Sequence, residues 1–152
     1  MQRAQPILQA ASQETLDKIQ VVHEALLQIA DVDIATEHLL HAGMYARTIR
    51  LEAGVVMVGA LIKRDTILII DGRTSLLAGD NRVDLEGYNV LPGCAGRKQL
   101  FVTLGPVVMT MLFPTEAQTV EEAENEVFAE ANLLMSRRDS SGDTTTITGE
   151  QA

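Results

Sequence analysis

Apolar residues along the chain follow first a helical and then a strand-like spacing. In the segment 12–30 they recur every three or four positions, which predicts an amphipathic helix with Ser12 as its N-cap. The apolar stripe of this helix consists of Leu16, Ile19, Val22, Leu26 and Ile29. The preceding residues 1–11 follow neither spacing, so they are predicted to form a flexible arm.

The segment from about residue 37 to residue 114 predicts short β-strands. Over 45–51 apolar and polar residues alternate, as expected for a strand with one buried face. Its apolar face holds Tyr45, Ile49 and Leu51, and its other face holds Arg50. The runs 55–58 and 67–70 are apolar at every position. Such solid runs predict strands that are covered on both faces.

Turn signals separate these strands at short intervals. The pair Asp71-Gly72 lies between two apolar runs and is predicted to be a hairpin turn. No helical pattern lies between the strands, so the pattern argues against a parallel α/β sheet. The predicted fold class is therefore mainly β, an antiparallel sandwich or barrel.

A second helix is predicted from about residue 119 to residue 136. Thr119 and Glu122 form a capping box, and Arg137-Arg138 suits the negative end of the helix dipole. The apolar stripe consists of Val120, Ala123, Val127, Ala131 and Leu134. Beyond it the chain is rich in Ser, Thr, Gly and Asp. Residues 137–152 are therefore predicted to be a disordered tail, of which 139–152 are dispensable for folding.

Composition and charge exclude several classes of function. The chain of 152 residues fits one domain, and its net charge of −9, with 3% aromatic residues and no Trp, argues against nucleic-acid binding. The acidity lies in the flanks, because the segment 44–114 holds eight basic and six acidic residues. No apolar run approaches the roughly 20 residues of a membrane span. With Cys94 as the single cysteine, we expect no intramolecular disulfide and a cytoplasmic protein.

Three segments of the central region resemble a known family. The runs 54–59, 70–72 and 89–93 resemble the two half-motifs of the cupins, in particular those of small cupin-like proteins encoded by tailed phages and prophages. In such proteins a segment like 43–47 enters the sheet and a segment like 113–115 leaves it. The resemblance covers about residues 40–136. It implies a cupin-like antiparallel jelly-roll barrel over residues 31–136, flanked by an N-terminal and a C-terminal helix.

The same resemblance implies that the protein lacks a metal centre. Cupins typically place a His-x-His pair and a Glu in the first half-motif and another His in the second, and these residues hold a metal ion inside the barrel. In this chain no His follows His41, and Asp65 and Asp71 have no acidic companions for a carboxylate site. His38 and His41 are three residues apart, so in a strand they point to opposite faces and cannot share a metal. In a helix they could meet, but no Cys or further His supports such a site. His23 is interpreted as a packed or surface residue. We expect no cofactor.

Other candidate groups have both a functional and a structural interpretation. Cys94 lies in a Pro-Gly-Cys-Ala-Gly loop, where a nucleophile would need a His partner, and a passive loop cysteine is the favoured interpretation. The basic pairs Lys63-Arg64 and Arg97-Lys98 would form an anion pocket if their strands meet. Alternatively they are solvated strand ends, or they pair with the acidic C-terminal helix. The apolar strands either line a ligand cavity or simply fill the barrel.

These observations favour a non-enzymatic, metal-free assembly or structural module. The phage resemblance implies a virion-associated role, as a capsid or tail accessory protein with other virion structural proteins as partners. We expect a homo-oligomer, by default a dimer, with no nucleic-acid or membrane partner. Its interface would use the two basic pairs and the helix residues Glu121, Glu122 and Glu124. Two alternatives remain open: a binding protein or metal-independent enzyme for an anionic small molecule, and a phage accessory protein that binds a host partner.

Overall fold

Two long strands, β4 (Thr66–Ala78) and β7 (Arg97–Pro114), form the centre of the fold and pair with each other in antiparallel orientation. The computed structural model describes residues 6–26, 34–134 and 142–148. The other elements are α1 (Gln13–Leu26), β1 (Thr36–His41), β2 (Met44–Leu51), β3 (Val56–Ile62), β5 (Asn81–Leu85), β6 (Tyr88–Gly93), α2 (Val120–Val127), the 3-10 turn η1 (Ala131–Leu133) and β8 (Thr144–Ile147). The strand order is β5-β4-β7-β2-β1-β8, with β3 also on β7 and β6 also on β4.

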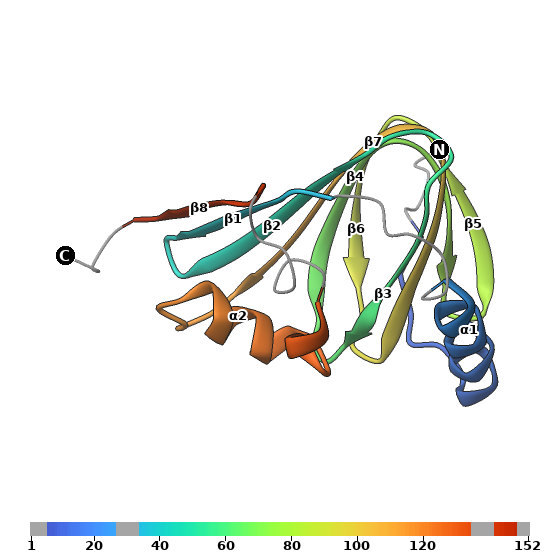
Figure 1. The fold of residues 1–152 in the computed structure, drawn as a ribbon, viewed down its shortest axis with the longest axis horizontal. Helices are drawn as coiled ribbons and strands as arrows, with labels where there is room; N and C mark the ends of the chain where they lie inside the picture. The colour runs from blue at the N-terminus through green and yellow to red at the C-terminus, as the bar shows by residue number, and fades with distance from the viewer. Residues whose placement is uncertain (1–5, 27–33, 135–141, 149–152) are drawn as a thin grey trace, which may run out of the picture.

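The sheet folds into two layers because β4 and β7 change neighbours partway along their length. The first half of β4 pairs with β6 and its second half pairs with β5. In the same way β7 begins beside β3 and ends beside β2. Figure 1 shows the two layers diverging from the bend of the long strands, with α2 at the open end. Helix α1 contacts β3 and β7. The predicted mainly β fold with flanking helices is confirmed.

The core lies between the two layers. Alternate residues of each strand point inward, and along β4 the buried positions are Thr66, Leu68, Ile70, Thr74, Leu76 and Ala78. The largest fully buried side chains in the described residues include Tyr45, Phe113, Leu8, Ile62, Ile70, Leu91, Val107 and Val127. They come from both layers and from α2, so the interior of the barrel is packed with the protein's own side chains. Neither described helix has the length and apolar content to cross a membrane.

The predicted hairpin at Asp71-Gly72 is wrong. Both residues lie inside β4, and the β4–β7 pairing shifts register between Gly72 and Thr74. Gly72 has a φ of +138°, and a Cβ placed on it would lie 2.4 Å from the carbonyl oxygen of Pro106. Glycine at this position therefore allows β4 to bend where it passes from one layer to the other. In the sequence, a glycine that permits such a bend looks the same as a glycine that permits a turn.

The two solid apolar runs are not covered on both faces as predicted. Val56 is 45% exposed between Val55 and Met57, which pack against the core, and Ile67 is 44% exposed beside the buried Leu68. Each run alternates between an inner and an outer face, as in an ordinary antiparallel sheet. The apolar side chains on the outer faces therefore contribute to the surface of the protein and not to its core.

The N-terminal helix forms as predicted, but part of the arm before it is held. The backbone N–H of Thr15 donates to the Ser12 hydroxyl at 3.2 Å, which confirms the cap. Leu8 is 2% exposed, and its backbone pairs with Pro92 and Cys94. The prediction of a flexible arm is therefore wrong for residues 6–11, whereas 1–5 and the predicted helix end at 27–30 lie outside the described residues.

The C-terminal helix begins as predicted and ends much earlier. The N–H of Glu122 donates to the Thr119 hydroxyl at 3.2 Å, which confirms the cap, while the Glu122 carboxylate accepts from the N–H of Gln118. The helix ends at Val127, because Phe128 is extended and pairs with Ile62. The backbone of Lys63 also donates to Val127 O at 2.7 Å. These bonds to the end of β3 replace the next helical turn, and residues 135–138 lie outside the described residues.

The predicted disordered tail is wrong for its central part. Residues 144–147 form β8, which pairs in parallel with β1 over Glu37–Leu40. The side chain of the preceding Asp143 is 8% exposed, and its carboxylate accepts the N–H of Thr36 at 2.9 Å. All four β8 residues are exposed, so the strand has no buried face. The alternation of apolar and polar residues that marks other strands is therefore absent from its sequence. Residues 137–141 and 149–152 lie outside the described residues.

Candidate functional site

The inner face of β1 and β2 carries a buried polar cluster under α2, which we call the polar cluster. Its members are His38, Tyr45, Arg47, Glu124 and Asp143. The two strands present His38, Tyr45 and Arg47 on their inner face, α2 supplies Glu124, and the segment before β8 supplies Asp143. The side chains of His38, Glu124 and Asp143 are each less than a tenth exposed. Three elements that are distant in sequence therefore meet through polar side chains in the core.

The hydrogen bonds of the cluster form a chain with a defined direction. Arg47 can only donate, and its Nη1 lies 2.5 Å from Glu124 Oε2 and 3.4 Å from the Tyr45 hydroxyl oxygen. The Tyr45 O–H is then free to donate to His38 Nδ1 at 2.7 Å. This bond assigns the proton of the neutral imidazole to Nε2, which lies 3.7 Å from Asp143 Oδ2. Neutral His38 therefore fits the cluster with both of its ring nitrogens in use.

Burial shifts the protonation of the cluster toward neutral side chains. Desolvation, followed by the charge of Arg47, lowers the pKa of His38, while Glu124 and Asp143 oppose the shift. Desolvation also raises the pKa of Tyr45 to about 12. The packing of Tyr45 explains its raised pKa. Its ring is fully buried and meets the Phe113 ring edge-on, with 5.6 Å between the ring centroids.

The acid–base groups of the polar cluster are largely shielded from solvent within the described part of the chain. Its side chains are enclosed by β1, β2, α2 and the Asp143 segment, and Tyr45 is 0% exposed. Among residues 6–26, 34–134 and 142–148, no group of three or more His, Cys, Asp or Glu is placed to hold a metal ion. The arrangement therefore suits the fixing of elements against each other better than it suits catalysis.

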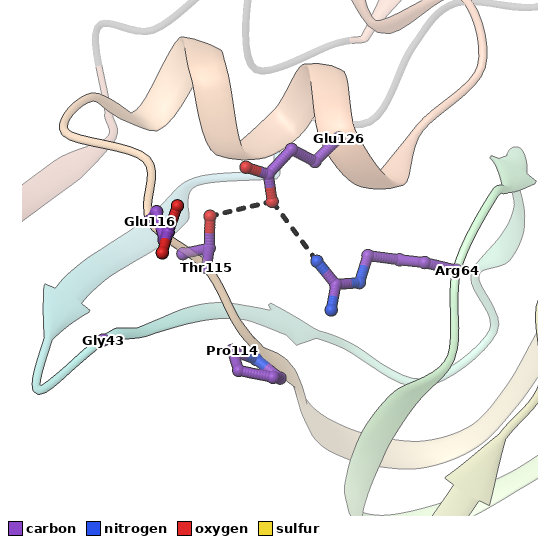
Figure 2. Close-up of a pocket in the computed structure, with 6 residues that line it drawn as sticks. All are labelled: Gly43, Arg64, Pro114, Thr115, Glu116 and Glu126. Carbon is purple, nitrogen blue, oxygen red and sulfur yellow. Dashed lines mark hydrogen bonds and ion pairs between the residues drawn. The ribbon is translucent and has the colours of Figure 1, made fainter.

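A pocket of about 490 Å³ opens beside α2 (Figure 2). It is lined by Gly43, Arg64, Pro114, Thr115, Glu116 and Glu126. Glu126 accepts from the Thr115 hydroxyl at 2.8 Å and from Arg64 at 3.3 Å, so these polar groups bond to one another within the pocket. The guanidinium of Arg64 also lies 4.6 Å from the centroid of the Phe113 ring. Two carboxylates against one guanidinium make the pocket a poor match for an anion.

The two predicted basic pairs do not converge on one anion pocket. Lys63 donates to Asn125 O at 2.7 Å and Arg64 pairs with Glu126, so this pair holds the end of α2. Lys98 donates to Gln20 of α1 at 2.6 Å. The alternative prediction, a salt bridge to the acidic C-terminal helix of the same chain, describes Arg64, whereas Lys63 bonds to a backbone carbonyl of that helix.

Arg97 is a buried cation that supports the loop after β6. It is 4% exposed, and it donates to Cys94 O at 2.8 Å and to the Thr66 hydroxyl at 2.7 Å. Burial lowers its pKa to about 10. A Cβ on Gly93 would lie 2.6 Å from the Arg97 Cζ, so this glycine makes room for the guanidinium. Cys94 is a half-buried free thiol, and its carbonyl serves Arg97, as expected for a structural loop position.

The predicted interface residues of the C-terminal helix divide into two groups. Glu121 and Glu122 are exposed, so they remain candidates for an interface. Glu124 is 2% exposed and pairs with Arg47 inside the protomer, so its assignment to an external interface is wrong. The helix period places residue 124 beside Ala123 and Val127 on the buried side of α2.

The two histidines of β1 lie on opposite faces of the strand, as their spacing predicts. His38 is buried, whereas His41 is exposed and its Nδ1 bonds to the Thr148 hydroxyl. His23 lies in α1, and its side chain lies outside the described residues. Sequence analysis missed the roles of Tyr45, Arg47 and Asp143. One signal was available, because Arg47 alternates in phase with Tyr45 and Ile49, and an arginine on a buried face requires an acidic or polar partner.

The outward side of the layer β6-β4-β7-β2-β1-β8 carries rows of apolar and mostly uncharged side chains, which we call the outer face. One row is Pro92, Ile67, Leu112, Ala46, Leu39 and Thr146, and the next is Val90, Ile69, Thr110, Thr48, Glu37 and Thr144. Leu39, Ile67 and Val90 are each about 40% exposed or more. Neither α1 nor α2 lies over these rows (Figure 1).

Comparison with known proteins identifies the fold class. No protein-family model matches the sequence, and no curated protein matches it. Among solved structures, salicylate 1,2-dioxygenase from Pseudoaminobacter salicylatoxidans in adducts with gentisate has a TM-score of 0.50 and 12% identity, over 81% of this chain and 38% of the dioxygenase chain. A cupin superfamily protein from Desulfitobacterium hafniense has a TM-score of 0.46 and 16% identity, over 60% of this chain and 86% of that chain.

A cupin-2 domain protein from Shewanella frigidimarina has a TM-score of 0.44 and 8% identity, over 65% of this chain and 98% of that chain. The described architecture is a jelly-roll type of antiparallel β-barrel with flanking helices, and the dioxygenase shares this fold at a TM-score of 0.50. Because the identities are this low, the likeness shows the fold alone. The chain spans less than half the length of the dioxygenase, and the activity of that enzyme is not carried over.

Proposed function

We propose that this chain is a non-enzymatic, metal-free cupin-like module that works through assembly, and that its first partner is a second copy of itself. The observation that supports this proposal is the contrast between the two sides of the same sheet. Inside, side chains of the protein fill the barrel and its polar groups bond to one another. Outside, a face of apolar and mostly uncharged side chains has no cover from the described helices.

The outer face offers the centre of a homodimer interface. Six strands spaced about 4.8 Å apart and the two rows about 6.8 Å apart span roughly 30 by 14 Å, or about 400 Å². This area is about half of the roughly 800 Å² that a standard interface buries on each partner. Because each chain carries a net charge of −9, two copies would repel unless they meet through uncharged surface. The two central rows provide such a surface, since Glu37 is their one charged residue and it pairs with Arg50.

The test measures the mass of the purified protein at micromolar concentration by light scattering and sedimentation. We expect twice the chain mass, and at least a tenfold weaker association for Ile67→Lys in the outer face. Val102→Lys is a matched control, because Val102 is 37% exposed on the other layer, and it should associate as the wild type does. A monomer at these concentrations, or equal effects of the two substitutions, would contradict the proposal.

The phage resemblance extends the proposal to a place in or on the virion. Copurification of the chain with phage particles, and its loss with Ile67→Lys but not with Val102→Lys, would support that extension. The competing function is the binding or conversion of an anionic small molecule, and the dioxygenase fold relation keeps an enzyme in view. A ligand screen by thermal shift separates the two, because a specific small ligand that raises Tm strongly would favour the competitor.

A further inference from the structure

The strand β8 forms one edge of its layer and carries none of the devices that usually protect a β-edge. It ends the strand order β5-β4-β7-β2-β1-β8, and among the described residues it pairs with β1 alone (Figure 1). Residues 144–148 read Thr-Thr-Thr-Ile-Thr, all of them β-branched residues of high strand propensity, with no charge and no proline. Natural proteins protect an edge strand with charges, a proline or a bulge, which block its pairing with another chain. An edge without these devices is open to an added strand.

The other edge strands of the described barrel differ from β8 in this respect. The edge strand β5 carries the exposed charges of Arg82 and Asp84. The edge strand β6 contains Pro92, which has no N–H to donate. In β3 a register shift interrupts the ladder, and the backbone of Phe128 and Ala129 bonds to the end of the strand. Among these edges, β8 is therefore the one without a charge, a proline or a bulge.

One hydrogen bond fixes which backbone groups of β8 face outward. The N–H of Thr148 donates to a carbonyl of β1 at 3.0 Å. In a parallel ladder every second residue bonds to the neighbouring strand, so Thr146 and Thr148 turn their N–H and C=O groups to β1. Thr145 and Ile147 turn theirs to the open edge, where no described residue bonds to them. Each chain thus offers two donors and two acceptors at this edge.

We propose that β8 pairs in antiparallel orientation with β8 of a second copy, about a two-fold axis at Thr146. In this register Thr145 lies opposite the partner's Ile147, and each such pair exchanges two hydrogen bonds, so all the open groups are satisfied. Thr146 faces its own counterpart across the axis, and Thr144 faces the partner's Thr148. The register pairs the whole of 144–148 because it is centred on that segment. The contact holds no charged residue, which suits a chain with a net charge of −9.

This edge contact goes beyond the outer-face dimer of the proposed function. The two-fold axis of a paired edge stands perpendicular to the sheet, so the outer faces of both copies lie on the same side and stay exposed. One chain then has two self-complementary surfaces, its outer face and its edge, and can join more than two copies. A contact of so few residues is small against a standard interface, so the edge pair alone is weak and adds little mass at micromolar concentration.

Disulfide capture in the full-length protein tests this register. Across the axis the Cα atoms of the two Thr146 residues lie about 4.5 Å apart, which suits a disulfide. Those of the two Thr144 residues lie about 14 Å apart, four residues out of register, which does not. Thr146→Cys and its matched control Thr144→Cys, both exposed on the same side of β8, are made in a chain that carries Cys94→Ser. Oxidised glutathione then couples two thiols into a disulfide and leaves two molecules of glutathione.

Both cysteine variants are also made with Ile67→Lys, which weakens the outer-face contact. At hundreds of micromolar chain we expect the disulfide-linked dimer to form at least tenfold faster for Thr146→Cys than for Thr144→Cys, with and without Ile67→Lys. Equal rates, or a faster Thr144→Cys, would overturn the edge pair. A Thr146→Cys rate that falls to the control level with Ile67→Lys would assign the capture to the outer face and overturn it as well. The outer-face dimer itself is judged by sedimentation of the chain without these cysteines, so each contact can fail alone.

A second substitution separates edge pairing from random collision of chain ends. Thr145→Pro removes an N–H that faces the open edge and leaves the bonds from β8 to β1 in place, whereas Thr145→Val keeps the N–H. Added to Thr146→Cys, the proline should reduce capture to the control rate and the valine should not. Hydrogen exchange of the Thr148 amide should show equal protection in both, because β8 stays on β1. Equal capture with proline and with valine would refute the edge pair.

Discussion

The bend in β4 makes Gly72 a sharp test of how the two layers are joined. In Gly72→Ala the new Cβ would lie 2.4 Å from Pro106 O and 2.9 Å from Val107 Cα, which are backbone atoms of the paired strand β7. A φ of +138° costs an alanine about 1 to 3 kcal/mol, and displacing packed backbone costs about 1 to 3 kcal/mol more. We expect a loss of about 4 kcal/mol, a large share of the roughly 5 to 15 kcal/mol that stabilises a domain.

Gly87→Ala separates the close approach from the backbone conformation. Gly87 also has a positive φ of +75°, but a Cβ on it would meet no atom within 4 Å. An alanine there should cost about 1 to 2 kcal/mol. Urea unfolding of both variants and the wild type, followed by circular dichroism, gives the free energies of unfolding at equal m-values. If the two variants lose the same stability, the contact between Gly72 and Pro106 does not hold the layers in register and our account of the bend fails.

Four further predictions follow from the contacts described above. Glu124→Ala should cost about 3 to 5 kcal/mol of unfolding free energy, since it removes the carboxylate of a buried ion pair, whereas Glu37→Ala at the exposed pair should cost little; equal losses in urea unfolding would contradict the burial argument. A chain ending at Arg138 loses β8 and the carboxylate of Asp143, and with them hydrogen bonds that contribute about 2 kcal/mol. Its Tm, measured by calorimetry, should therefore fall by about 4 to 8 °C. An unchanged Tm would restore the prediction of a dispensable tail. Tyr45, with its pKa raised to about 12, gives stability that is complete below about pH 10 and is lost as the pH rises toward 12; alkaline absorbance titration should show a late tyrosine phase that Tyr45→Phe abolishes. Elemental analysis of protein purified without chelator should find less than one transition metal ion per ten chains, and one retained equivalent per chain would overturn the metal-free proposal.

The fold class was predictable because it depends on local patterns that repeat. Short alternating runs and frequent turn residues define an antiparallel β protein without any knowledge of which strands pair. The cap residues Ser12 and Thr119 were also predictable, since a cap bonds to its own helix. These signals act over a few residues, so the sequence displays them directly.

The errors arose where distant residues decide the local structure. The C-terminal helix stops at Val127 because the end of β3 pairs with Phe128, about 65 residues away in the chain. β8 forms on the edge of β1 with exposed threonines, whose strand propensity was visible but whose partner was not. Gly72 serves a bend and not a turn for the same reason, because the clash that requires it comes from Pro106.

The candidate site was less predictable than the fold. The sequence shows that the side chains of Lys63, Arg64, Arg97 and Lys98 are charged. The partner of each side chain depends on which face of a strand end it occupies, and the sequence does not show this. The polar cluster combines residues from positions 38 to 143, and nothing in the sequence links its carboxylates to its bases. The alternation of side chains along one strand was the single available signal, since it placed Arg47 on the buried face with Tyr45.

The pairing of β7 has a consequence for how the chain is made. β7 is the common neighbour of β2, β3 and β4, and it follows all three in the sequence. During synthesis these strands leave the ribosome before the strand that joins them, so each presents an unsatisfied backbone edge until Pro114 has emerged. The barrel cannot close by adding one hairpin after another, and its closure waits for a strand in the last third of the chain. Nascent chains that stall before residue 97 would therefore be the form of this protein most exposed to aggregation.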